Sequence, residues 1–243
     1  MRLFRLVCII ALTAFALDCS QKDRPLSPSP DASDYGEQST RATSLLKVVR
    51  DKSAGGQAKM DAVIQLGALN DPKTVKPLID ILKQDMRERS GIWAAAIPAL
   101  GGLGKSEAVP VLLEALNNRD DDWLGREMAA DALGDIADPV SVDALIKSSY
   151  FADTRESCIQ ALAGMGDVRA VEVLIGALDE AENPETIEAA GKGLLKMGDA
   201  ALPALQKELQ NHSKEHPNRY RREIVGQIIN RFKTKDRPDT RQR

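Results

Sequence analysis

The first segment whose residue types could do chemistry is a glycine-rich run, residues 99–106 (ALGGLGKS), which ends in Lys105 and Ser106. Glycines followed by Lys-Ser are typical of loops that cradle a nucleotide phosphate. Such a loop also needs a strand before it and a helix that starts at Lys-Ser, so that backbone N–H groups point at the phosphate. Here the run has the same place in a repeated pattern as Leu133-Gly134, where we expect a helix to end. The glycines therefore predict a helix stop, and no nucleotide site is expected.

Residues that could bind a metal are sparse. The two histidines are His212 and His216, with Glu215 between them, and such a pair in a polar loop falls short of the ligand set of a zinc site. The acidic run at residues 117–122 lacks the glycine and the final glutamate of a calcium loop. Cys158 lies on the apolar side of an expected helix and is interpreted as a small core residue. The sequence thus predicts no catalytic residue, no metal site and no cofactor.

The composition indicates closely packed helices. Hydrophobic residues make up 43% of the chain and aromatic residues only 4%, and alanine, leucine and valine are frequent. The net charge of -3 is too small to indicate a nucleic acid as partner. Basic residues gather in residues 207–243, which we interpret as a solvated stretch rather than a binding site for nucleic acid or lipid.

A repeat runs through the chain, with 29 to 34 residues between successive units. Each unit has an anchor leucine, an apolar residue three positions later, and then a break that contains Gly, Asp or Pro. Such a break ends one helix and caps the next. The anchor leucines, which small residues surround, are Leu66, Leu100, Leu133, Leu162 and Leu194.

A second apolar run follows each break, with spacings of three and four residues that mark one face of a helix. In the first unit this run contains Val75, Leu78, Ile79 and Leu82. Each unit is therefore a helix pair, and its apolar stripe is buried only when neighbouring units stack. This predicts an all-α fold, a right-handed α-solenoid of about five helix-pair repeats over residues 40–233. Lone helices around residues 42–49 and 222–232 are expected to cap its ends.

Two phrases carry a family resemblance, residues 126–139 (REMAADALGDIADP) and 155–167 (RESCIQALAGMGD). They resemble the short HEAT-like repeats first associated with phycobilisome bilin lyases. Arg126 and Arg155 match the arginine that this family places seven residues before the anchor leucine. The resemblance implies an α-solenoid, but such repeats carry many unrelated functions. The family includes metal-dependent hydroxylases with His-Glu pairs, and this sequence has no His-Glu pair.

The N-terminal residues 1–18 are typical of a secretory signal peptide. Arg2 and Arg5 precede an apolar run, residues 6–17, which is too short to span a bilayer comfortably. The protein is therefore expected to be exported from the cytoplasm.

Two processing sites compete at the end of this segment. The sequence Ala16-Leu17-Asp18-Cys19 resembles the lipobox of bacterial lipoproteins, with Asp18 in place of the usual small residue, and it predicts that Cys19 is lipidated. The alternative is ordinary cleavage after Ala16, which would leave a periplasmic or secreted protein. Residues 19–39 are expected to be a disordered tether, and residues 234–243 a basic disordered tail.

These features favour a non-catalytic scaffold or adaptor at the bacterial cell envelope, which binds a peptide or protein on its concave face. Second helices are expected to line that face. They would place along it a row of charged residues: Asp80, Glu114, Lys147 and Lys207. A row of small apolar residues beside it includes Val111 and Val173. The alternative interpretation is that the small row only lets helices approach and that the charges face solvent.

The expected partners are a protein or peptide and, through a lipid on Cys19, a membrane. Neither a nucleic acid nor a small-molecule substrate is indicated. The alternative function, which the family resemblance implies, is an enzyme or cofactor-maturation factor of the HEAT-like lyase type. A third hypothesis is a purely structural component of the envelope.

Overall fold

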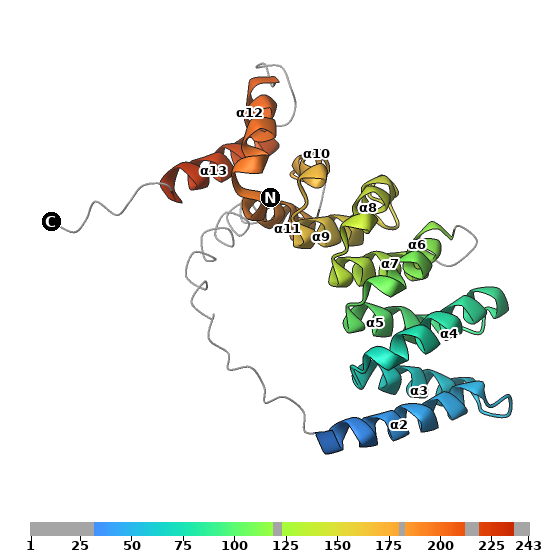
Figure 1. Ribbon diagram of the computed structural model, residues 1–243. Coiled ribbons are helices and arrows are strands. Elements are labelled where there is room, and N and C mark those ends of the chain that lie inside the picture. The colour runs from blue at the N-terminus through green and yellow to red at the C-terminus, as the bar shows by residue number, and fades with distance from the viewer. Residues whose placement is uncertain (1–31, 119–122, 180–182, 212–218, 236–243) are drawn as a thin grey trace.

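The computed structural model describes residues 32–118, 123–179, 183–211 and 219–235, and the regular elements within these ranges are helices (Figure 1). A pair made of a first and a second helix recurs along the chain. The first helices are α3 (Gly56–Ala68), α5 (Trp93–Leu103), α7 (Trp123–Ile136), α9 (Arg155–Met165) and α11 (Pro184–Met197). The second helices are α4 (Val75–Glu88), α6 (Val109–Asn117), α8 (Val142–Ser148), α10 (Val171–Gly176) and α12 (Leu202–Asn211). The predicted all-α solenoid is confirmed.

Single helices flank these pairs, and they reach beyond the predicted boundaries. α2 (Ala32–Arg50) starts where we expected the tether, and α13 (Arg219–Lys235) ends two residues after residue 233. The predicted signal peptide, Cys19, both histidines and residues 236–243 lie outside the described residues. None of the helices in the described ranges combines the length and the apolar character that crossing a membrane requires.

Short 3-10 turns connect the two helices of each pair, and aspartates cap several of them. Asp71, Asp138 and Asp167 each accept a hydrogen bond from the backbone N–H two residues later, at 2.9, 3.0 and 3.0 Å. These bonds satisfy donors that the start of a helix leaves without a partner. Before the turns, Gly104 and Gly166 end their helices with φ of 63° and 68°, a conformation that costs glycine little. The predicted breaks are therefore the turns inside each pair.

The anchor leucines form the centre of the core. All five of them are 0% exposed, as the repeat predicted. Burying one leucine side chain contributes about 2 kcal/mol. The core that they join is a single cluster that runs from Ala42 to Ile229, as expected when stacked units bury their apolar stripes against one another.

The first helices stack on one another more closely than the second helices do. A methyl group on Gly67 would lie 2.6 Å from Cβ of Ala99 in the next unit, and one on Gly134 would lie 2.7 Å from Cβ of Ala161. Contacts between consecutive first helices are extensive, whereas those between consecutive second helices are few. The inner side of a curved stack is its shorter side. Accordingly, α3, α5, α7, α9 and α11 lie on the inner side of the arc, and α4, α6, α8 and α10 lie on the outer side (Figure 1).

The prediction that the second helices line the inner face is therefore wrong. The small residues around the anchor leucines decide the direction of curvature, because alanine and glycine let neighbouring helix axes approach closely. These residues lie on the first helices, so the stack closes on that side.

Candidate functional site

The first helices present a continuous exposed surface on the inner side of the arc, and its residues follow from helix geometry. Each residue turns about 100° around the helix axis, so positions two before and two after an anchor leucine point away from the core. Every residue at these positions is exposed, and together they are named the inner face. They are Ile64, Ala68, Pro98, Gly102, Asp131, Asp135, Gln160, Gly164, Lys192 and Lys196.

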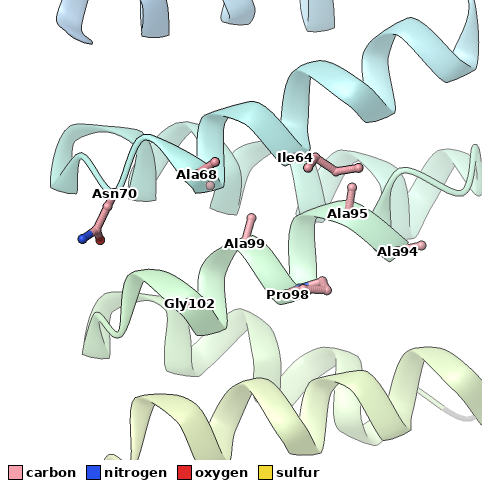
Figure 2. A pocket seen from close by; sticks show the side chains of 9 residues that line it. Ile64, Ala68, Asn70, Ala94, Ala95, Pro98, Ala99 and Gly102 are labelled. Atoms are coloured by element: carbon pink, nitrogen blue, oxygen red, sulfur yellow. The ribbon is translucent and has the colours of Figure 1, made fainter.

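The N-terminal end of the inner face is apolar. A shallow hollow of about 330 Å³ lies between α3 and α5, and residues of both helices line it (Figure 2). Ile64 is 54% exposed there, and Ala68, Ala94, Pro98 and Gly102 add only small side chains. This part of the inner face is named the apolar hollow. Its exposed isoleucine has no role in the core.

Pro98 interrupts the hydrogen-bond pattern of α5 beside the hollow. It lies within α5, and proline has no N–H to donate to the carbonyl oxygen four residues earlier. The Ala94 carbonyl, on the same helix, is therefore left without its α-helical donor. The polar residue that lines the hollow is Asn70, whose side-chain amide can both donate and accept hydrogen bonds.

The middle of the inner face is acidic. Asp131 and Asp135 lie one turn apart on α7, Glu127 lies one turn before them, and Glu156 lies on the neighbouring α9. These four residues are named the acidic patch. Glu156 accepts hydrogen bonds from Gln160, at 3.2 Å, and from Asn183, at 2.8 Å, which hold it in place.

In the acidic patch, the charged forms of Asp131 and Glu127 are disfavoured by their surroundings. Desolvation raises the pKa of Asp131, and repulsion from Asp135 and Glu156 adds to the effect, while a hydrogen bond with Ser157 opposes it. The pKa of Glu127 is also raised, first by desolvation and then by Asp131 and Glu156. A cation placed among these carboxylates would relieve the repulsion.

The C-terminal end of the inner face is basic, and its charges are already engaged. Lys192 forms an ion pair with Glu188 at 2.6 Å. Lys196 donates a hydrogen bond to the Gly164 carbonyl on α9. The inner face thus changes along the solenoid from apolar to acidic to basic.

The residues predicted for partner binding lie on the second helices. Asp80, Glu114, Lys147 and Lys207 are exposed, but their helices do not line the inner face. Val111 and Val173 are 1% and 9% exposed and belong to the core cluster. The prediction of an apolar groove through these two valines is wrong, because their side chains pack inside the stack. The alternative interpretation, in which the small row serves packing, fits both residues.

Glu114 does lie beside a second depression, of about 680 Å³, at the ends of α4 and α6. The depression is also lined by Lys83, Met86 and Arg87. Its charges are mixed, so it does not select one sign of ligand.

Two other sequence predictions concern chemistry, and both agree with the structure. Residues 99–106 form the end of α5 and the following turn, with Gly104 as the left-handed helix stop. Cys158 is fully buried, and desolvation raises the pKa of its thiol to about 12. A thiol with this pKa is a core residue and not a nucleophile at neutral pH. Among the described residues no cluster of His, Cys, Asp and Glu could hold a metal ion.

The inner face itself was missed by the sequence interpretation. A signal for it was present, since counting two positions either way from each anchor leucine finds all of its residues. What the pattern of apolar residues could not supply was the side toward which the stack curves.

Comparison with known proteins gives a family and a related fold. The family model for HEAT repeats matches residues 91–150 and 146–227. No curated protein matches the chain. Among solved structures, human deoxyhypusine hydroxylase in complex with glycerol is similar, with 20% sequence identity and a TM-score of 0.50 over 82% of this chain and 75% of that chain. At this identity the likeness shows a shared fold only.

Proposed function

Because the chain belongs to the HEAT repeat family, we propose that it is a binding scaffold that holds a protein or peptide on its inner face. The observation that carries the proposal is the contrast between packing and surface in the first helices. The anchor positions keep one chemistry, with leucine in every unit, while the exposed positions two residues away change from apolar to acidic to basic. A surface whose exposed residues differ from repeat to repeat, while the buried residues stay the same, is suited to recognition of a specific partner. Stacked repeats offer an extended surface for such binding.

The place of action in this proposal is the cell envelope. Residues 1–18 have the pattern of an export signal, and Cys19 would carry a lipid that tethers the solenoid to a membrane. Without lipidation the same scaffold would be periplasmic or secreted.

Site-specific photo-crosslinking in cells tests the scaffold. A photoreactive amino acid would replace Gln160 on the inner face in one variant and Lys147 on the outer side in another. We expect a discrete crosslinked partner from position 160 and none from position 147. A partner captured only at position 147 would move the binding site to the second helices. No partner at either position would contradict the scaffold.

Intact mass after expression with the native leader tests the location. A chain that starts at Cys19 with added acyl groups, found in membranes, is the expected result. A chain that starts at Leu17 in the soluble fraction would exclude the lipid anchor, and one that still starts at Met1 in the cytoplasm would exclude export. Metal and cofactor analysis of the same purified protein addresses the enzyme alternative, since a bound group at one equivalent would favour it.

A further inference from the structure

We infer that the inner face from α3 to α9 binds an extended peptide segment that carries an apolar side chain and, several residues away, lysine or arginine. The inference rests on the proposed scaffold function and names the chemistry of its partner. Two neighbouring features carry it, the apolar hollow and the acidic patch. It is their order along one surface that identifies the partner.

The apolar hollow suits the apolar side chain of such a segment. Covering Ile64 and its small neighbours removes apolar area from water, which contributes about 25 cal/mol per Å². Asn70, which also lines the hollow, can accept a hydrogen bond from the peptide backbone through its side-chain oxygen. An extended segment has free backbone N–H groups, whereas a helical segment uses most of its own internally.

The acidic patch suits the basic part of the segment. Asp131 and Asp135 lie one turn apart on α7, with Glu127 on the same helix and Glu156 on α9. Desolvation disfavours the charge of Asp131 and Glu127, and repulsion from the neighbouring carboxylates adds to the effect. A lysine or arginine bound among them gains attraction and removes that repulsion. An acidic segment would add to it and would be rejected.

The distance between the two features sets the spacing within the segment. Packed helices lie 8–10 Å apart, and an extended chain advances about 3.3 Å per residue, so roughly three residues span one helix. The acidic patch lies on α7 and α9, one and two helices beyond α5. The hollow lies between α3 and α5, so α7 and α9 are about one and a half and two and a half helix spacings away. The basic residues are therefore expected about four to eight positions from the apolar side chain. On α11 the inner face carries Lys192 and Lys196, so the part of the face that attracts a cation ends at α9.

In the described residues, the outer side has no apolar hollow that is followed along the solenoid by an acidic patch. Glu114 lies beside Lys83 and Arg87, so its charge is offset locally. This difference supplies a matched control, because the double variant Asp80→Asn/Glu114→Gln removes two carboxylates from the outer side. The test variant, Asp131→Asn/Asp135→Asn, removes two from the inner face.

The test uses the full chain and a phage-displayed library of random 12-residue peptides as the probe. Enriched peptides are synthesised with a fluorophore, and their binding is followed by anisotropy. We expect the peptides to pair an apolar residue with lysine or arginine at the spacing above. Their affinity should fall about ten-fold with the inner double variant and about ten-fold with Ile64→Ser, and change less than about two-fold with the outer variant. Circular dichroism confirms that each variant is folded.

The outcomes separate this inference from the scaffold proposal. Enriched peptides that are acidic or uncharged would overturn the inference, as would basic peptides that bind the inner double variant unchanged. If no peptide is enriched but crosslinking at position 160 yields a partner, the scaffold stands and the peptide inference fails. If the enriched peptides match the sequence of residues 236–243, the bound segment belongs to this chain itself. That result would overturn the inference of a separate partner.

Discussion

Gly101 on α5 lies against Ala132 on α7 so closely that a methyl group on Gly101 would stand 2.8 Å from the Cα of Ala132. The next residue, Gly102, is different. A methyl group there would meet nothing within 4 Å, because this position faces the open inner side. The first glycine allows two helices to approach, and the second leaves the inner face without a side chain.

Substitution of these adjacent glycines is expected to have opposite effects. Gly101→Ala should destabilise the fold by about 1–3 kcal/mol, because the added methyl group forces the two helix backbones apart. Gly102→Ala should be neutral or stabilise by up to about 1 kcal/mol, because alanine is the better helix former and has room. Urea denaturation of the two variants measures the difference. Equal effects would show that the close approach of α5 and α7 does not limit the fold.

The same pair shows how far the sequence predicts the structure. The spacing of Leu100 and Leu133 predicts the helices, their pairing and the buried side of each, because burial of an apolar stripe depends on local periodicity. It does not predict the curvature, which depends on how closely two helices that are distant in the sequence can stack. The position of Val111 was also mispredicted, because its side chain packs into the core between stacked helices rather than onto a surface. The acidic patch escaped notice because the inner side was assigned to the wrong helices, although Asp131 and Asp135 stand one turn apart in the sequence.

The ion pair between Arg126 and Asp153 is expected to stabilise the third repeat. Arg126 is 9% exposed, and its Nε donates to Asp153 at 2.8 Å while another of its nitrogens donates to the Asn118 carbonyl at 3.2 Å. Asp153→Ala removes the carboxylate and leaves a buried cation less well compensated, so it should cost about 1–3 kcal/mol.

A more exposed ion pair provides the comparison for that variant. Nη1 of Arg169 lies 3.2 Å from Oδ1 of Asp143, and the two side chains are 41% and 68% exposed. Asp143→Ala should therefore change the free energy of unfolding by less than about 0.5 kcal/mol. Similar losses from Asp153→Ala and Asp143→Ala in urea denaturation would count against a special role for Arg126.

The pH dependence of stability should differ in sign between two aspartates. In the folded protein the pKa of Asp131 is raised above 3.8, mainly by desolvation, so its ionisation destabilises the fold. This penalty is absent below pH 3.8 and complete once the pH exceeds the raised pKa. Asp131→Asn should therefore raise Tm at pH 7, and its advantage over the native chain should shrink as the pH falls toward 3.8.

Asp167 is the counterpart in this experiment. Hydrogen bonds from Arg169 lower its pKa, so its charged form stabilises the fold above the ordinary pKa, and this stability is lost as the pH falls through the lowered value. Asp167→Asn should lower Tm at pH 7 and have less effect in acid. Thermal unfolding followed by circular dichroism from pH 7 to pH 3 compares both variants. A lower Tm for Asp131→Asn at pH 7 would contradict the penalty that desolvation and repulsion place on the charge of Asp131.

Cys158 should react with thiol reagents only when the solenoid unfolds. Its side chain is fully buried, and its pKa of about 12 leaves very little thiolate at pH 8. In a chain with Cys8→Ser and Cys19→Ser, Cys158 is the single remaining thiol. Alkylation by iodoacetamide, followed by mass spectrometry, should then be slow without denaturant and complete in 6 M urea. Because Cys158 lies on α9, in the fourth of the five helix pairs, its labelling rate at intermediate urea reports the opening of that repeat. If the capping helices open first, as the ends of repeat stacks tend to, labelling should begin only after part of the helical signal is lost. Rapid labelling of the native chain would show that the core around α9 opens far more readily than its burial indicates.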